Sequence, residues 1–157
     1  GTSTIAVDCL QGLSKELEPR LQKKQLKLDM QIPDGIKLNL PPETTQIILR
    51  NLLTNAIKYS YEGGQINVSV SDVGAIEVRD FGVGMSNERR SELFKNIQDS
   101  DCGTAKEVGT GIGLYMSLEM VEKHMNGKLL VDNETFIYDG IEYKGACFKI
   151  IIPLNIN

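Results

Sequence analysis

The stretch from Pro42 to Ser60 constrains the fold more than any other part of this sequence. Pro41 and Pro42 favour an extended entry followed by the first turn of a helix. At about 100° per residue, the apolar side chains that follow fall on one wide arc of that helix. They are Ile48, Leu49, Leu52, Leu53, Ala56 and Ile57. An arc of this width packs against a sheet, so the stretch predicts a helix that covers the core of a layered domain.

The opposite side of this predicted helix is polar in a regular way. Asn51, Asn55 and Lys58 follow an i, i+4, i+7 spacing, with Tyr59 at the edge of the stripe. Two amides and an ammonium group on one face are able to bind an anion through a metal ion, and they are equally able to face water. The helix alone leaves both interpretations open.

Length and composition indicate one ordinary domain. The chain has 157 residues, of which 41% are hydrophobic and 24% charged, and no apolar run or signal-peptide pattern predicts a membrane segment. A net charge of −4 argues against a nucleic-acid surface. The three cysteines, Cys9, Cys102 and Cys147, are odd in number and lack paired spacing, which favours reduced thiols in a cytosol over disulfides or zinc.

Hydrophobic periodicity and turn residues predict the order of the other elements. We expect a strand Thr4–Val7, a helix Cys9–Gln25 capped by Asp8, strands Leu26–Ile32 and Ile36–Leu40, the helix from Pro42, a hairpin of Gln65–Val70 and Ala75–Asp80, a short helix from Ser86 to about Phe94, a helix from Leu114 to about Met125, a strand Lys128–Asp132, a small hairpin of Phe136–Tyr138 and Ile141–Tyr143, and a closing strand Ala146–Leu154. This order predicts an α+β fold. We expect a two-layer sandwich of residues 1–157, with a mixed, largely antiparallel sheet and about three helices on one face.

A glycine cluster opens the helix near Leu114: Gly109-Thr110-Gly111-Ile112-Gly113. Glycines at a helix start let the backbone approach a ligand, and the free N–H groups attract phosphate. They also serve plain turns and close packing. The cluster lacks the features of a dinucleotide-binding motif or a P-loop.

A second cluster, Asp80-Phe81-Gly82-Val83-Gly84-Met85, places a carboxylate at the end of a strand. Such a carboxylate is able to accept a hydrogen bond from an exocyclic amine, and the glycines leave room for a flat ring. The alternative is a simple Asx-type turn. The aperiodic stretch after Phe94 is typical of a lid over a ligand. Lys95 and Lys106 beside it either reach phosphates or face solvent.

Together, these motifs carry a resemblance. The order Asn51-x-x-x-Asn55, Asp80-x-Gly82-x-Gly84, Leu93-Phe94 and Gly109-x-Gly111-x-Gly113 resembles the N, G1, F and G2 boxes of the histidine-kinase ATP-binding domain, whose fold is shared by gyrase, Hsp90 chaperones and MutL. The resemblance runs from about Ile5 to Leu154, and four motifs in the same order make it highly specific.

The resemblance implies ATP or ADP and Mg²⁺ as cofactors, with Asn55 as the metal ligand. Lys58 and Tyr59 would line the phosphate side, and Asp80 would bind the adenine amino group. The base pocket would be shaped by Gly82, Val83, Gly84 and Met85. The lid would run from Phe94 to Val108 and include Lys106, and the phosphates would lie near the backbone of Gly109, Thr110, Gly111, Ile112, Gly113 and Leu114.

Asn51 is the expected catalytic distinction. ATP-hydrolysing relatives resemble one another in carrying a Glu at this place to activate water, whereas an amide is a poor base. The resemblance therefore implies a cytoplasmic kinase domain that transfers phosphate to a histidine on a separate dimerisation domain, for relay to a response-regulator receiver domain. It implies neither nucleic-acid binding nor direct membrane contact. A nucleotide-gated interaction module, a degenerate kinase and an anti-sigma-factor-type serine kinase are the alternatives.

Two departures from the family pattern bear on activity. His124, the sole histidine, is expected on the surface near a helix C-terminus, and no dimerisation helices precede Asp8, so we expect no autophosphorylation. Cys147 stands where relatives often carry Thr or Ser, which predicts either a weakened contact to the adenine or a buried inert thiol.

Overall fold

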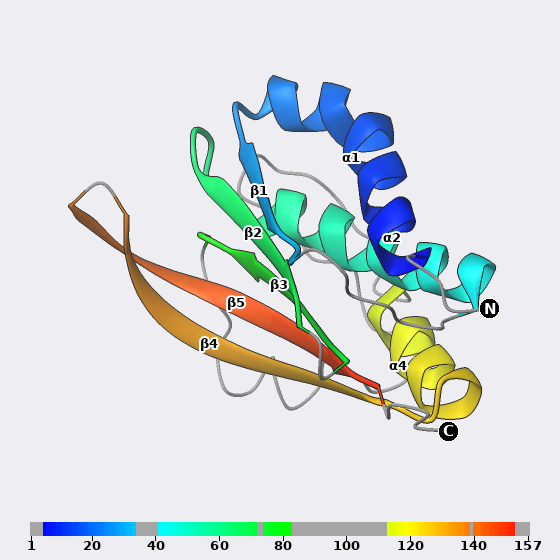
Figure 1. Ribbon diagram of the computed structural model, residues 1–157. Helices are drawn as coiled ribbons and strands as arrows, with labels where there is room; N and C mark the ends of the chain where they lie inside the picture. Colours follow the sequence, from blue (N-terminus) through cyan, green and yellow to red (C-terminus); the bar gives the residue numbers. More distant parts are fainter. Residues whose placement is uncertain (1–4, 34–40, 72–73, 83–112, 139, 153–157) are drawn as a thin grey trace.

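A mixed five-stranded sheet forms one layer of the protein, and helices form the other (Figure 1). The computed structural model describes residues 5–33, 41–71, 74–82, 113–138 and 140–152. Within these residues, three helices lie on the same face of the sheet. The predicted α+β sandwich is therefore confirmed.

The sheet combines one parallel and three antiparallel pairings. Its order is β1 (Lys27–Gln31), β2 (Gln65–Val70), β3 (Ala75–Asp80), β5 (Ile141–Ile151) and β4 (Lys128–Tyr138). Strand β1 runs parallel to β2, which is why a whole helix lies between them in the chain. The β2–β3 hairpin is confirmed, and Gly74 at its turn has a φ of 84°, a conformation that suits glycine.

The first helix, α1 (Ile5–Lys23), begins earlier than expected. The predicted strand Thr4–Val7 is wrong from Ile5 onward, and Asp8 lies inside the first helical turn instead of capping it. A short apolar run does not distinguish a strand from a helix. Ala6 continues the spacing of Leu10 and Leu13 by one more turn, so the helical pattern extends through this run.

The end of α1 is a tight left-handed cap. Gln25 has a φ of 55°, and the N–H of Leu26 donates to the carbonyl oxygen of Leu21 at 2.8 Å. The N–H of Gln25 donates to the carbonyl oxygen of Gln22 at 3.0 Å, completing a Schellman motif. Leu21 and Leu26 are both buried, so the cap turns the chain directly from α1 into β1.

The predicted central helix is α2 (Pro42–Tyr59), and all six residues of its apolar arc are buried. It packs against α1 on one side and against α4 (Gly113–His124) on the other. Inward-facing residues of the strands complete the core, including Ile66, Val78 and Phe148. Asn126, with a φ of 51°, lies between α4 and β4 as expected for a helix end.

The last two strands are longer than predicted. The strand Lys128–Asp132 and the small hairpin that follows it form one continuous pair, because β4 and β5 stay in register from Lys128↔Ile151 to Tyr138↔Ile141. The turn residues between the predicted segments do not interrupt the ladder. The predicted strand Ile36–Leu40 and the helix from Ser86 to Phe94 lie outside the described residues.

One buried hydroxyl in α2 predicts a stabilising substitution. Thr45 is 1% exposed, and among the described residues its Oγ1 has no hydrogen-bond partner. Thr45→Val keeps the side-chain shape and removes this desolvated hydroxyl, so the free energy of unfolding should rise by about 1 kcal/mol. Denaturant unfolding measures the change. Thr54→Val is the control, because the Thr54 hydroxyl donates to the carbonyl oxygen of Asn51 at 3.2 Å. A loss of stability in Thr45→Val contradicts the prediction.

Candidate functional site

Four of the predicted site residues, Lys58, Tyr59, Asp80 and Gly82, lie where the end of α2 touches the end of β3. Ser60, directly after α2, forms an antiparallel bridge with Gly82, and the N–H of Tyr61 donates to the carbonyl oxygen of Phe81 at 3.5 Å. These contacts join two segments that the sequence singled out separately. They bring the polar stripe of α2 close to the carboxylate at the end of β3.

Asp80 is a buried carboxylate. It is 1% exposed, and its Oδ1 accepts a hydrogen bond from the N–H of Ala146 at 3.3 Å. Burial raises the pKa of Asp80 to about 7, while the N–H groups of Ala146 and Gly82 and the positive charge of Lys24 lower it. The group therefore titrates near neutral pH. When ionised, it is a strong acceptor for an N–H donor.

Gly82 must be glycine because there is no room for a side chain, and not because of its backbone angles. A Cβ at this position would lie 2.0 Å from the carbonyl oxygen of Tyr59 and 2.8 Å from Oδ1 of Asp80. Both neighbours are held, one in the last turn of α2 and the other in a buried strand. The close approach of the two backbones forms one wall of the site.

The polar stripe of α2 supplies the remaining described groups. Asn55 and Lys58 are half-buried, and Nζ of Lys58 lies 4.9 Å from the centre of the Tyr59 ring. At this distance the ammonium and the aromatic ring attract each other, which holds the positive charge at the end of the helix. The arrangement presents an amide, an ammonium and a ring in sequence along the stripe.

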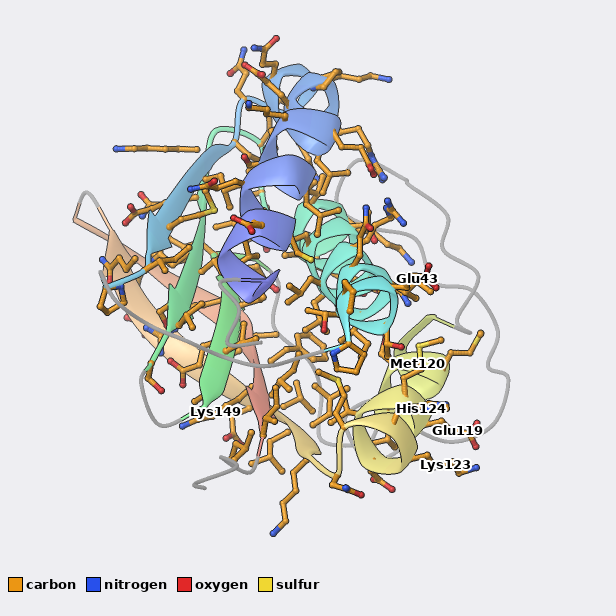
Figure 2. All side chains as sticks on the ribbon, turned by 45° about the vertical axis from the view of Figure 1, so that its right-hand side comes forward. Glu43, Glu119, Met120, Lys123, His124 and Lys149 are labelled. Atoms are coloured by element: carbon orange, nitrogen blue, oxygen red, sulfur yellow. The ribbon has the colours of Figure 1, made fainter. Side chains whose placement is uncertain are left out.

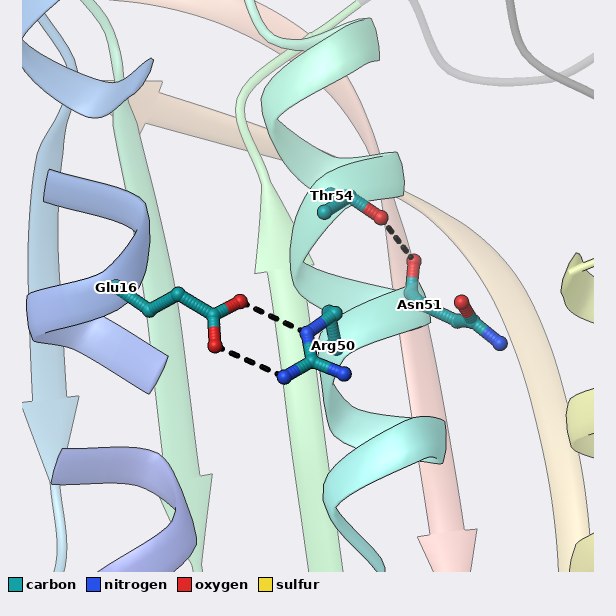
Figure 3. A network of polar contacts seen from close by, with 4 residues as sticks. All are labelled: Glu16, Arg50, Asn51 and Thr54. Carbon is teal, nitrogen blue, oxygen red and sulfur yellow. Dashed lines mark hydrogen bonds and ion pairs between the residues drawn. The ribbon is translucent and has the colours of Figure 1, made fainter. Parts of the chain in front are cut away.

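Asn51 joins α2 to α4. Its Nδ2 donates to Oγ of Ser117 at 3.1 Å, and Ser117 is fully buried. Figure 3 shows the Asn51 side chain directed away from α1 and toward α4, while Arg50 points the other way. Arg50 binds both carboxylate oxygens of Glu16 on α1 at 2.8 Å. The neighbouring residues Arg50 and Asn51 thus fix α2 between the two other helices.

Sequence reasoning missed Lys24 and Ser117. Lys24 is 6% exposed, and its Nζ donates to the carbonyl oxygens of Ile57 at 2.6 Å and Lys58 at 2.9 Å. Nothing in the sequence separates it from the exposed Lys23 beside it. Ser117 left a signal, because it interrupts the inner stripe of α4 between Leu114 and Val121. A small polar residue on an apolar stripe indicates a buried hydrogen bond.

Several predicted site residues lie outside the described residues. They are Val83, Gly84, Met85, Phe94, Lys106, Gly109, Thr110, Gly111 and Ile112. Gly113 and Leu114 form the first turn of α4, as predicted. The described half of the site therefore consists of α2, the end of β3 and the start of α4.

Cys147 lies on β5, one residue beyond the position beside Asp80. Cys147 pairs with Arg79 and Asp132, whereas its neighbours Ala146 and Phe148 belong to the core under the helices. Because successive strand residues face opposite sides, Cys147 points away from the helical layer. The residue next to Asp80 is Ala146, whose N–H donates to the carboxylate. Cys147 is buried, as the alternative interpretation required.

His124 is exposed in the last turn of α4, as predicted. Figure 2 shows it with Glu119 and Lys123 on the side of α4 turned away from the sheet. Lys123 forms an i, i+4 ion pair with Glu119 at 3.4 Å. These groups belong to a solvated helix face and lie apart from Asp80.

The residues present fit a magnesium ion shared with a ligand better than a metal held by protein alone. Within the described ranges, no three His, Cys, Asp or Glu side chains gather in a way that would hold a metal. Mg²⁺ usually keeps several waters and binds one or two protein oxygens together with substrate phosphates. The amide oxygen of the half-buried Asn55 is such a donor.

This fold is that of histidine-kinase catalytic domains. The chain is similar to the catalytic domain of histidine kinase ThkA, with a TM-score of 0.76, 19% identity, and coverage of 93% of this chain and 92% of that one. It is also similar to full-length ShkA in complex with AMPPNP, with a TM-score of 0.67, 23% identity, and coverage of 98% of this chain and 30% of that one.

The family follows from the sequence match. Residues 41–156 match the model of the histidine kinase-, DNA gyrase B- and HSP90-like ATPase family, and the chain belongs to that family. Adaptive-response sensory kinase SasA of Nostoc is 31% identical over 96% of this chain and 36% of its own length. Sporulation kinase E of Bacillus subtilis is 31% identical over 89% of this chain and 18% of its own length.

The chain therefore spans well under half the length of these relatives. None of the helices in its described part is both long enough and apolar enough to cross a membrane.

Proposed function

We propose that this chain is the ATP-binding catalytic domain of a sensor histidine kinase. In this proposal, residues 1–157 form a single cytoplasmic domain that binds Mg²⁺-ATP and transfers the γ-phosphate to a histidine on a dimerisation domain. A response-regulator receiver domain then takes the phosphate. The observation that carries the proposal is the buried, ionisable Asp80 beside the wall that Gly82 and Tyr59 form.

Adenine recognition rests on Asp80. An exocyclic amine of the base offers an N–H donor, and a buried carboxylate is a stronger acceptor for it than a neutral group. The absence of a side chain on Gly82 lets the end of α2 lie directly against the end of β3, beside this carboxylate. Val83, Gly84 and Met85 continue the pocket in our proposal.

Phosphate binding rests on the stripe of α2 and the start of α4. Lys58 and Tyr59 would contact the phosphates, Asn55 would hold Mg²⁺, and Phe94, Lys106 and the backbone of residues 109–114 would bind the triphosphate. Bound Mg²⁺ neutralises phosphate charge and thereby lowers the barrier to phosphoryl transfer. The N-terminus of α4 at Gly113 suits an anionic ligand.

The environment of Asn51 supports transfer of the γ-phosphate to a protein over hydrolysis of ATP by water. Its amide donates to the buried Ser117 hydroxyl and lacks the basicity to deprotonate a water molecule. In transfer, a histidine nitrogen forms a bond to the γ-phosphorus while the bond from that phosphorus to the β–γ bridging oxygen breaks, and ADP leaves. The role of Asn51 is then to hold α2 and α4 in place without offering a base.

Phosphotransfer to the cognate dimerisation domain tests the proposal. The 157-residue chain, that domain, Mg²⁺ and γ-labelled ATP should give a phosphohistidine, which is stable to base and labile to acid. Phosphoserine would instead indicate a serine kinase. ATP binding without any transfer would overturn the kinase proposal in favour of a nucleotide-gated module.

Asn55→Ala should remove the dependence of ATP affinity on Mg²⁺. The parent should bind ATP roughly tenfold more tightly with Mg²⁺ than with a chelator, since the ion links protein and phosphates. In the variant the two affinities should converge. Calorimetric titration measures both, and Gln46→Ala, at an exposed position on the same helix, is the control. A Mg²⁺ effect of parental size in Asn55→Ala excludes Asn55 as the ligand.

A further inference from the structure

A lysine outside all the predicted motifs supports the base-binding end of the site. Lys24 follows α1, and its Nζ reaches across to α2, donating to the carbonyl oxygens of Ile57 at 2.6 Å and Lys58 at 2.9 Å. The side chain is 6% exposed. A buried ammonium at a helix C-terminus satisfies carbonyls that lack helical partners and matches the negative end of the helix dipole.

The backbone of Lys24 is tied to the same region. Its carbonyl oxygen accepts a hydrogen bond from the N–H of Gly63 at 3.0 Å, in the turn that leads from α2 into β2. The Schellman motif around Gln25 fixes the direction in which this backbone leaves α1. Side chain and main chain of Lys24 therefore hold the end of α2 from two directions.

What Lys24 holds is one side of the candidate pocket. The residues directly after Lys58 are Tyr59, whose carbonyl oxygen faces Gly82, and Ser60, which forms the bridge to Gly82. A displacement of this helix end would move the wall against which Gly82 and Asp80 lie. Lys24 acts on this wall through its hydrogen bonds to the end of α2, and on Asp80 through its charge.

Among the described residues, a few groups determine the electrostatic surroundings of Asp80. Lys24 approaches from the end of α1 and exerts a favourable field on the carboxylate. Lys58 and Tyr59 lie at the end of α2. From β5 Asp80 meets the uncharged N–H of Ala146, and its partner on β2 is Ile66.

The charged residues of the neighbouring strands lie elsewhere. Lys149 on β5 pairs with Glu77 on β3 at 3.4 Å. Both alternate with core residues along their strands and so face the other side of the sheet.

We propose that Lys24 is a positioning residue for the adenine-binding carboxylate, holding the end of α2 against β3 and presenting a positive charge to Asp80. This inference rests on the proposed nucleotide-binding function. It assigns to the turn after α1 a part in base recognition, although that turn lies outside every recognised motif of the family resemblance.

Lys24→Met tests the inference with Lys23→Met as a matched control, since Lys23 is the exposed neighbour. Two quantities are measured across a pH series: the titration midpoint of the Asp80 carboxyl by carbon-13 NMR, and the affinity for Mg²⁺-ATP by calorimetry. In Lys24→Met the midpoint should rise by about one pH unit, because an opposite charge is lost. Affinity should fall about tenfold near pH 7, with the loss narrowing as the pH rises toward about 9. Lys23→Met should match the parent.

The pH profile separates the electrostatic action of Lys24 on Asp80 from plain destabilisation. An equal loss of affinity at every pH, or parental behaviour of Lys24→Met, overturns the inference. Lys24→Gln, whose amide donates without charge, should show the same rise of the midpoint. If both variants fail to fold, Lys24 is required for the fold itself and the inference is wrong. If the parent binds no nucleotide, the proposed function fails, while the NMR midpoint still decides whether Lys24 acts on Asp80.

Discussion

Asp80→Asn is expected to abolish tight binding of adenine nucleotides and, at the same time, to stabilise the empty domain above neutral pH. The binding loss follows from replacing a charged acceptor by an amide, whose NH₂ group also opposes the exocyclic amine. Loss of a hydrogen bond to a charged group corresponds to a roughly 10- to 100-fold weaker affinity. Calorimetric titration with Mg²⁺-ATP and with ADP measures it.

The gain in stability has a defined pH window. The pKa of Asp80 is raised from 3.8 to about 7 by burial, so the folded state binds its proton more tightly than the unfolded state. The contribution of Asp80 to stability is therefore fully present below about pH 4 and is lost as the pH rises to about 7. This difference corresponds to a cost on the order of 4 kcal/mol above neutrality, part of which Asn avoids.

Denaturant unfolding of parent and variant at about pH 5 and about pH 8.5 measures this effect. The variant should be more stable at the higher pH by roughly 1–2 kcal/mol, with a smaller difference at the lower pH. Asp132→Asn, at an exposed carboxylate, should show no such trend. A variant that binds ATP like the parent would exclude Asp80 as the adenine acceptor. A variant less stable at both pH values would contradict the assignment of a costly buried charge.

Gly82→Ala is expected to damage both the fold and the site. The added Cβ would lie 2.0 Å from the carbonyl oxygen of Tyr59, which is impossible without separating α2 from β3. Overpacking against backbone should lower the free energy of unfolding by about 3 kcal/mol. ATP binding should become undetectable in the same titration, because Asp80 shares the displaced wall.

Two other glycines provide the controls. A Cβ on Gly12 would meet nothing within 4 Å, so Gly12→Ala in α1 should raise stability by about 0.5–1 kcal/mol. A Cβ on Gly127 would lie 2.5 Å from the carbonyl oxygen of Ile151, at the junction of α4 and β4. Gly127→Ala should therefore destabilise the fold while leaving nucleotide affinity close to that of the parent. Parental affinity and stability in Gly82→Ala would refute the geometry of the wall.

Local patterns in the sequence were sufficient to predict which residues are buried, wherever burial depends on the geometry of a single helix or strand. The arc of α2 was predicted residue by residue, because helical periodicity determines which side of a helix is buried. The alternation of apolar and polar residues likewise predicted strand β3, with Asp80 at its end. The polar stripe from Asn51 to Tyr59 was found for the same reason.

Tertiary contacts explain what local patterns could not supply. No local pattern distinguishes the buried Lys24 from the exposed Lys23 beside it. The left-handed backbone at Gln25 helps to fix the direction of the chain after these two residues. The contact of Ala146 with Asp80 was not predicted, because the pairing of β5 with β3 sets a register that the strand itself does not reveal. The helical start at Ile5 was missed because a short apolar segment suits either structure.

The order of the sheet also bears on how this domain can change over evolution. Strand β3 pairs with β5, although β4 and α4 come between them in the chain. The ladder from Ala75↔Ile151 to Arg79↔Cys147 and the contact of α2 with α4 thus hold Gly82 and Gly113, the two ends of residues 83–112, from either side. A change in the length of residues 83–112 therefore need not alter the register of β3 with β5 or the hydrogen bond from Asn51 to Ser117, so the carboxylate and the polar stripe of α2 can keep their places.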